Sequence, residues 1–397
     1  MNAKARWFLV ALSTPLVIVA AVGGLIGASP ATPQKGFEHL RVFEDVVSLV
    51  NGAYVEDVDP DKIFAGAMRG LVEGLDASSA YLPPAEVALI DNKTPLADGD
   101  TGLMITRQFY LRVLGVRDGS PAAKAGIRSG DFIRAIDETP TRDMSAFTGT
   151  RLLRGAVGSK VRVLIIRGNA AEPHEVTLTR EKASAVAVTG EVKSSDKVGV
   201  VRVQTFAATG TGGVAASLRS QAEMMQKAGA KAMVIDIRGV ADGSYEEAIK
   251  AAEVFVGAGV IASRAGRDAA VKETITSTSG AAAVKIPVVI LQDFGTAGPA
   301  EVFAAALGGN KRAEIVGERS AGLAAEQRLV RLPENFGLWM TYRRYYNIPK
   351  TGETAQPILE HGVQPDVIVE EPNVEFGEAA PAVDEMLAKA IERAKAM

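Results

Sequence analysis

The chain has 397 residues and a formal net charge of -3. This length predicts two or three domains with ample core, and the lack of a basic surplus argues against nucleic acid as a partner. The sequence holds no cysteine, which excludes disulfides, thiol nucleophiles and cysteine-based zinc sites.

The N-terminus carries a long apolar run. Lys4 and Arg6 precede residues 7–28, which contain no charged side chain and are long enough to span a bilayer. Small residues near the end of the run leave cleavage after Ala28 or Ala31 open. Residues 1–35 are therefore predicted to be a signal sequence or an uncleaved inner-membrane anchor. Because a cationic flank stays in the cytoplasm, we expect the remainder to be exported, to the periplasm or cell envelope.

Residues 36–97 are predicted to be an N-terminal helical segment. A second helix is expected after Pro60, and no catalytic constellation lies in this segment. Apolar residues recur every three or four positions in its first half: Leu40, Phe43, Val46, Val47 and Val50.

Residues 98–182 are rich in short strand patterns around glycine turns. TGLMI, YLRVLGV, KVRVLIIRG and HEVTLTR alternate as strands do, and SAFTGTRLLRG is helical. The stretch GSPAAKAGIRSGDFIRAID is similar to the motif of PDZ domains, and TGLMI resembles their carboxylate-binding turn. The resemblance implies a domain that binds peptide C-termini.

The turn at Gly102 has a physical role in that interpretation. Successive backbone N–H groups there would hold a peptide's terminal carboxylate while the peptide adds as an extra strand. The alternative is that Gly102 only permits a turn and the apolar residues are core. The predicted peptide-binding residues are Gly102, Leu103, Met104, Ile105 and Phe147, with Leu152 as an alternative to Phe147.

Residues 183–373 alternate between strand and helix. KVGVVRVQTF, KAMVIDIRG, IPVVILQDF and AEIVGE are expected strands separated by helices, which predicts a mainly parallel sheet covered by helices. Sites in such sheets lie at the carboxyl ends of strands. Three of these ends are DIRGVADG, DFGTAGP and GERSAGLAAEQ.

Together these segments resemble the carboxy-terminal processing, or tail-specific, serine peptidases. LDASSAYL resembles the family's LDPHSSYL, DIRGVADG its DLRNNPGG, GTAGPAEV its GSASASEI, and GERSAGLAAEQ its GEXTFGKGXVQ. The resemblance covers nearly the whole chain beyond residue 36. It implies an α/β fold, α+β overall, with a crotonase-like core, an inserted PDZ domain and, in active members, a Ser/Lys dyad.

The chain departs from the family at the dyad itself. The nucleophilic serine falls on Gly298 and the general-base lysine on Leu323, and neither residue can perform that chemistry. Pro299 has no N–H for an oxyanion, and Asp242 stands where the first glycine of the other donor turn is expected. Only Gln327 matches the family's dyad-supporting glutamine.

Two functions compete on this sequence. The first is a pseudoprotease that binds or delivers protein C-termini. The second is a working endopeptidase that uses displaced residues such as Thr296 or Ser320, with Lys311 as the nearest amine. No cofactor is expected, and no motif indicates a metal.

The C-terminal segment, residues 374–397, is predicted to end in an amphipathic helix. Val383, Leu387 and Ile391 share a face, and Glu385 is placed to pair with Lys389. The apolar face is expected to dock on the core or on a second copy, so a homodimer or a complex with an active family member is a further expectation.

Overall fold

The computed structural model describes residues 33–168, 172–182, 186–193, 196–208, 210–278, 280, 284–349, 354–372, 374–378 and 381–397. The predicted anchor at 7–28 lies outside these residues. Across the described ranges, no helix combines the length and apolar character that a membrane span requires. The chain separates into two compact units, Met1–Ala67 and Met68–Met397.

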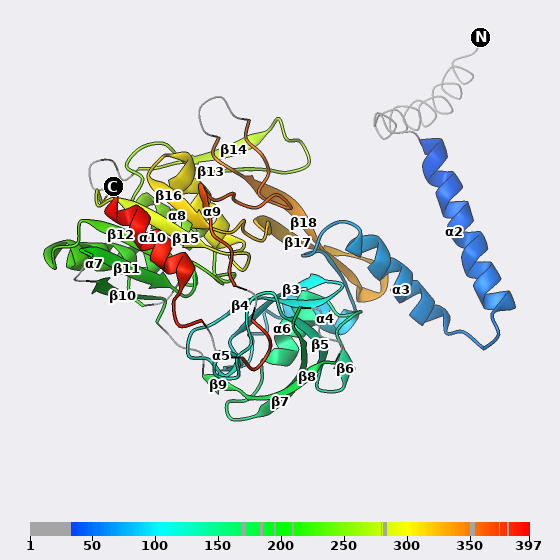
Figure 1. The fold of residues 1–397 in the computed structure, drawn as a ribbon. Coiled ribbons are helices and arrows are strands. Elements are labelled where there is room, and N and C mark those ends of the chain that lie inside the picture. The colour runs from blue at the N-terminus through cyan, green and yellow to red at the C-terminus, as the bar shows by residue number, and fades with distance from the viewer. Residues whose placement is uncertain are drawn as a thin grey trace, which may run out of the picture. The chain divides into compact units, whose positions relative to one another are not determined.

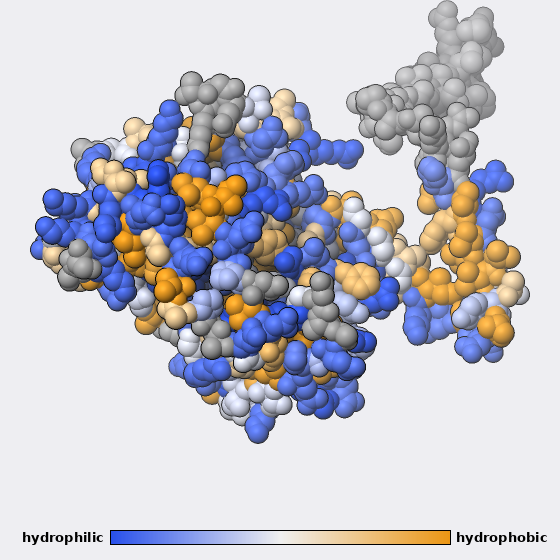
Figure 2. All heavy atoms as spheres, viewed as in Figure 1, coloured by the Kyte–Doolittle hydropathy of each residue, from blue (hydrophilic) through white to orange (hydrophobic). Residues whose placement is uncertain are grey.

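The first unit contains the two helices that the periodicity predicts. They are α2 (Pro33–Ala53) and α3 (Pro60–Glu73), of which α3 continues past the unit boundary. Figure 2 shows apolar side chains along α2, and Leu40, Phe43 and Val46 are exposed there. The apolar stripe of α2 is therefore formed as expected and lies on the helix surface.

A small antiparallel domain, called here the PDZ-like domain, follows in the second unit. Its sheet has the order β3-β4-β5-β7-β8, so β3 is an edge strand, and α6 contacts it. Its elements are β2 (Gly99–Asp100), β3 (Leu103–Gln108), β4 (Tyr110–Val116), α5 (Pro121–Lys124), β5 (Phe132–Ile136), β6 (Thr139–Pro140), α6 (Ala146–Leu153), β7 (Lys160–Ile166), β8 (His174–Thr179) and β9 (Glu181–Lys182).

The core domain is built on a six-stranded sheet whose order is β10-β11-β12-β15-β16-β19. All neighbours in it are parallel except β10 and β11, as the alternation of strand and helix predicts. Its strands are β10 (Val188–Lys193), β11 (Val198–Val203), β12 (Ala232–Asp236), β15 (Val288–Gln292), β16 (Ala313–Gly317) and β19 (Val367–Ile368).

Helices cover both faces of this sheet. Because strand side chains alternate, Met233 packs in the cluster beneath α7 (Gly213–Lys227), α8 (Tyr245–Glu253) and α9 (Pro299–Gly309). Val234 packs instead in the cluster beneath α10 (Glu385–Lys395), the red helix of Figure 1. This arrangement leaves the strand ends available for a site.

A second, antiparallel sheet completes the core domain. It contains β1 (Ala80–Leu82), β13 (Val260–Ala265), β14 (Lys272–Thr276), β17 (Ala325–Arg331) and β18 (Gly337–Tyr346), with α4 (Pro84–Asp91) and the short helix η2 (Pro333–Asn335) nearby. The expectation that residues 36–97 form a helical segment is wrong at β1. Its residues pair with Gly337–Trp339 of β18, a contact that no local pattern reveals.

The C-terminal helix docks on its own core. Met386, Ala390 and Ala394 are buried against the parallel sheet, so the apolar face is covered without a second copy. Val383 precedes the helix and is exposed, which corrects its predicted place in the stripe. Lys389 pairs with Glu392, three residues further on, at 2.8 Å and not with Glu385, four residues before it. On a helix, residues three apart and residues four apart are both close enough to pair.

Candidate functional site

The three predicted turns meet at the carboxyl edge of the parallel sheet. The backbone N–H of Ala297 donates to Val240 O at 2.9 Å, and the N–H of Ala321 donates to Thr296 O at 2.9 Å. The turns after β12, β15 and β16 are thus hydrogen-bonded to one another. The sequence prediction that these turns share one edge agrees with this geometry.

Gly298 is the residue that immediately precedes α9. Its φ of 56° lies in the region that favours glycine. A Cβ placed there would meet only the Tyr245 hydroxyl, at 3.6 Å. That hydroxyl donates to Ala325 O and accepts from Ala325 N, both at 2.9 Å, and burial raises its pKa. No side chain therefore stands at the position where the family's serine falls.

Glu301 is a buried residue whose hydrogen bonds connect the turns of the site. Its buried carboxylate accepts the N–H groups of Gly298 at 2.9 Å, Gly322 at 2.6 Å and Leu323 at 2.8 Å. Burial raises the pKa of Glu301 to about 6, against the lowering effect of these hydrogen bonds. One carboxylate thus fixes the two turns that would carry the dyad, a role the sequence analysis did not assign to it.

The nearby hydroxyls named as displaced nucleophiles are both fully buried. Ser320 Oγ donates to Glu301 Oε1 at 2.5 Å and accepts from Val363 N at 2.7 Å. Thr296 Oγ1 lies 3.0 Å from Ile237 O and accepts from the N–H of Asp293 at 3.2 Å. These hydroxyls therefore connect loops to each other by hydrogen bonds.

Asp242 connects the core to the PDZ-like domain. Its carboxylate accepts from Arg117 at 2.6 Å, and the same guanidinium donates to Asp100 at 2.7 Å. Asp100 in turn accepts the N–H of Gly102 at 3.0 Å. Arg117 therefore joins the predicted carboxylate-binding turn to the predicted oxyanion turn.

A cavity of about 510 Å³ lies between the PDZ-like domain and the core. Four of the predicted core positions line it: Gly298, Pro299, Leu323 and Gln327. Ile105 and Phe147 line it from the PDZ-like domain. Asp242 is not among the lining residues, although Ala241 and Gly243 are. Positions predicted from the PDZ resemblance and positions predicted from the peptidase resemblance thus line the same cavity.

The other predicted peptide-binding residues lie outside this cavity. Leu103 is packed in the buried core of the PDZ-like domain, Met104 pairs with Gly115 of β4, and the N–H of Gly102 is taken by Asp100. Leu152, the predicted alternative to Phe147, is exposed. Phe147 packs against the cluster formed by Ala80, Leu82 and Val87.

The PDZ-like domain approaches the core backbone to backbone. A Cβ on Gly115 would lie 1.8 Å from Gly239 O, and one on Gly295 would lie 1.9 Å from Leu114 O. Arg112 also stacks over Phe294, with Cζ 4.0 Å from the ring centroid. Only glycine fits at Gly115 and Gly295, so the two surfaces are complementary at atomic contact.

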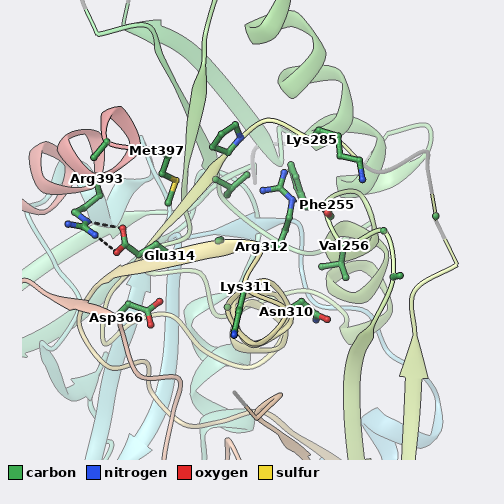
Figure 3. A pocket seen from close by; sticks show the side chains of 18 residues that line it. Phe255, Val256, Lys285, Asn310, Lys311, Arg312, Glu314, Asp366, Arg393 and Met397 are labelled. Carbon is green, nitrogen blue, oxygen red and sulfur yellow. Dashed lines mark hydrogen bonds and ion pairs between the residues drawn. The ribbon is translucent and has the colours of Figure 1, made fainter. Parts of the chain in front are cut away.

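A larger hollow of about 1,050 Å³ lies at the opposite, amino-terminal ends of β15 and β16 (Figure 3). Its charged groups are largely engaged in structure: Arg393 pairs with Glu314 at 2.6 Å, and Arg312 donates to the carbonyl of Phe255 at 3.0 Å. Of the residues predicted for the site, only Lys311, the amine named for the displaced dyad, lines this hollow; it does not line the cavity that holds Gly298 and Leu323. In the part of the chain that the structure describes, no group of three or more His, Cys, Asp or Glu side chains could hold a metal.

Tyr245 and Arg151 are among the lining residues that the sequence analysis did not assign to the site. The contact of Tyr245 with Ala325 joins residues 80 positions apart, so it is visible only in three dimensions. Arg151 lies one helical turn after Phe147 in α6, so helical spacing alone places it on the same face. That spacing is the signal that could have found it.

Comparison with known proteins agrees with this architecture. Residues 197–369 match the model of peptidase family S41, and residues 112–167 match that of a PDZ domain. A carboxy-terminal-processing protease of Bartonella bacilliformis is 27% identical over 91% of this chain and 81% of that protein. A chloroplastic C-terminal processing peptidase of Tetradesmus obliquus is 30% identical over 76% of this chain and 67% of that protein.

A solved structure supports the same assignment. The photosystem II D1 C-terminal processing protease has 26% sequence identity and a TM-score of 0.65, with coverage of 84% of this chain and 94% of that chain. The α/β core with an inserted PDZ domain that the sequence predicts is thus confirmed. This chain belongs to peptidase family S41, the carboxy-terminal processing proteases, and carries the PDZ domain of that family.

Proposed function

We propose that this chain binds protein or peptide C-termini and holds them at a peptidase-type site that does not hydrolyse them. The observation that carries the proposal is the cavity of about 510 Å³ shared by PDZ residues and by Gly298 and Leu323. It offers space for a peptide where the family places its dyad, without a hydroxyl or an amine at those two positions. Such a protein would act as a scaffold or adaptor for its clients, or would deliver them to an active relative.

Peptide recognition is supported by the position of β3. This strand is the edge of the PDZ sheet and lies beside α6, so an extended peptide has backbone donors and acceptors with which to pair. Ile105 on β3 and Phe147 on α6 face the same cavity. The relatives are named for processing at carboxy termini, and the same kind of ligand fits this arrangement.

The absence of hydrolysis is supported by several positions that would have to act together. Acyl transfer needs a nucleophile, a base and donors to the oxyanion. Gly298, Leu323 and Pro299 supply none of these, and the Asp242 carboxylate is paired with Arg117. The displaced alternative has less support, because Thr296 and Ser320 are buried and hydrogen-bonded within the fold.

We also propose that the working part of the chain is exported. In this proposal residues 1–35 form the signal or anchor, 36–97 the helical segment, 98–182 the PDZ domain, 183–373 the peptidase-like core and 374–397 the C-terminal helix. An alkaline phosphatase fusion after residue 40 should be active, and a cytoplasmic reporter at the same point should be silent. The reverse pattern would overturn the topology. The apolar face of α10 packs against the sheet of its own chain, so it no longer supports self-association.

The binding function can be tested with the full chain in detergent. A fluorescent peptide that ends in an aliphatic residue with a free carboxylate should bind, and mass spectrometry should recover it intact after long incubation. The C-terminal amide of the same peptide should bind more weakly, by about 1.5–3 kcal/mol, because it lacks a charge-assisted acceptor. Equal affinity for acid and amide would contradict carboxylate recognition, and a shortened peptide would contradict the absence of hydrolysis.

A further inference from the structure

The cavity between the PDZ domain and the core has an unusual balance of charge. Most of its walls are apolar, including Leu96, Leu114, Leu323 and Trp339, and no carboxylate lines it. Arg151 is the one charged side chain among the described residues that line it. In surroundings of low polarity, a lone cation favours an anion more strongly than it does in water.

Arg151 is held in place without being neutralised. Its guanidinium stacks on Phe147, with Cζ 5.0 Å from the ring centroid, and one amino group donates to Thr94 O at 3.2 Å. Its Nε is buried and has no hydrogen-bond partner. A planar guanidinium that is held in one orientation and forms no ion pair among the described residues is suited to bind a carboxylate.

Glu86, an acid that Arg151 influences electrostatically, already has a hydrogen-bond partner. Glu86 on α4 accepts from the Thr148 hydroxyl at 2.5 Å, and burial raises its pKa, while Arg151 acts on it only at longer range. Within the described ranges no carboxylate forms an ion pair with Arg151. Two neighbouring arginines of the domain, Arg117 and Arg154, both pair with Asp100, whereas Arg151 does not.

The turn predicted to hold a carboxylate is, by contrast, partly occupied. The N–H of Gly102 donates to Asp100, and that carboxylate is buried at the turn. A second carboxylate at the same place would face an existing negative charge, although Arg117 and Arg154 offset it. A ligand carboxylate therefore has a reason to bind elsewhere in the cavity.

We infer that Arg151 is the specificity-determining residue of this site and binds a carboxylate of the bound peptide in the cavity between the PDZ domain and the core. The inference rests on the proposed function and adds the chemistry of the ligand to it. The carboxylate is either the peptide's C-terminus or an acidic side chain. Both supply oxygen acceptors for the guanidinium of Arg151 where it lines the cavity.

Three peptides of one apolar sequence distinguish these sources. The first has a free C-terminus and no acidic residue, the second is its C-terminal amide, and the third is the amide with one glutamate moved through successive positions. Their affinities are measured by fluorescence anisotropy for the full chain in detergent. The variants are Arg151→Gln, Arg151→Lys and a matched control, Arg134→Gln, which changes an exposed arginine on β5.

Arg151→Gln should weaken binding of the carboxylate-bearing peptide about 10- to 100-fold and leave the plain amide unchanged. Arg151→Lys should recover part of the loss, and Arg134→Gln should match the unmodified chain. A loss confined to the first peptide identifies the C-terminus as the ligand, and a loss confined to the third identifies an acidic side chain. Arg151→Gln with unaltered affinity for both overturns the inference and leaves the proposed function standing.

Two controls distinguish failure of this inference from failure of the proposed function and from misfolding of the variant. If the unmodified chain binds none of the peptides, the proposed function and this inference both fall. If Arg151→Gln does not fold, as judged by its near-ultraviolet circular dichroism, the unmodified chain still provides a test. Added salt should then weaken the carboxylate-bearing peptide and spare the plain amide, and equal salt dependence would overturn the inference.

Discussion

Arg117 of the PDZ domain lies 2.6 Å from Asp242 of the core, and both side chains are largely withdrawn from solvent. The family resemblance aligns Asp242 with a glycine of the oxyanion turn, and in this structure Asp242 forms an ion pair between domains. Arg117 also holds Asp100. Asp242 thus has a structural partner that a glycine at the same position could not have.

The strength of this pair can be measured by a double-mutant cycle. Arg117→Ala, Asp242→Ala and the double variant should give a coupling free energy of about 1–3 kcal/mol, since both partners are hydrogen-bonded and partly buried. The exposed pair Lys124 and Glu181 is the matched control, with an expected coupling of about 0–1 kcal/mol. Denaturant midpoints provide the readout. Strict additivity at Arg117 and Asp242 would mean that the contact adds nothing to stability.

The backbone contact between the domains gives a second prediction. Gly295→Ala should lower the free energy of unfolding by about 2 kcal/mol or more, because its Cβ would overlap Leu114 O. Gly70→Ala in α3, where a Cβ meets nothing within 4 Å, should be neutral or slightly stabilising. Thermal unfolding of both variants checks this. A Gly295→Ala protein with an unchanged free energy of unfolding would show that the PDZ domain does not contact the core at this point.

Local sequence patterns predicted most elements but few of the contacts between them. Apolar alternation and helical spacing placed the strands of the parallel sheet and α2, because these depend on neighbours along the chain. The pairing of β1 with β18 and the bond between Arg117 and Asp242 join residues far apart in sequence. The positions Gly298 and Leu323 came from the family resemblance, and only the structure shows that they share a cavity with Phe147.

Glu301 predicts a dependence of stability on pH. Burial raises its folded pKa to about 6, above the ordinary value of 4.5, so the folded state holds this proton more tightly than the unfolded state. The stability that it contributes is present below pH 4.5 and is lost as the pH rises through 6. The loss is about 2 kcal/mol at 1.36 kcal/mol for each unit of pKa.

Glu301→Gln removes this titration. The variant should be less stable overall, because its amide group would face backbone N–H donors. Its free energy of unfolding should also change less between pH 4.5 and pH 6.5, by about 1.5 kcal/mol relative to the unmodified chain. Urea denaturation at both values measures the difference. Identical pH profiles would show that Glu301 does not titrate in this range.

Partial restoration of the dyad should not restore hydrolysis. Gly298→Ser alone should be inactive and about 1–2 kcal/mol less stable, since serine must adopt a positive φ. Adding Leu323→Lys should also fail, because Pro299 still provides no N–H and members of a catalytic set act as a unit. The combination with Pro299→Ala and Asp242→Gly is the first that supplies every missing part. Peptide hydrolysis by Gly298→Ser alone would contradict this order.

The most direct test of binding without hydrolysis is a long proteolysis assay with the unmodified full chain and an unfolded protein substrate that has an apolar C-terminus. Thr296→Ala and Ser320→Ala are assayed beside it, after circular dichroism has shown that both are folded. We predict no cleavage products from any of the three proteins. Turnover by the unmodified chain that disappears in either variant would show that the nucleophile has moved, and would contradict the pseudoprotease account.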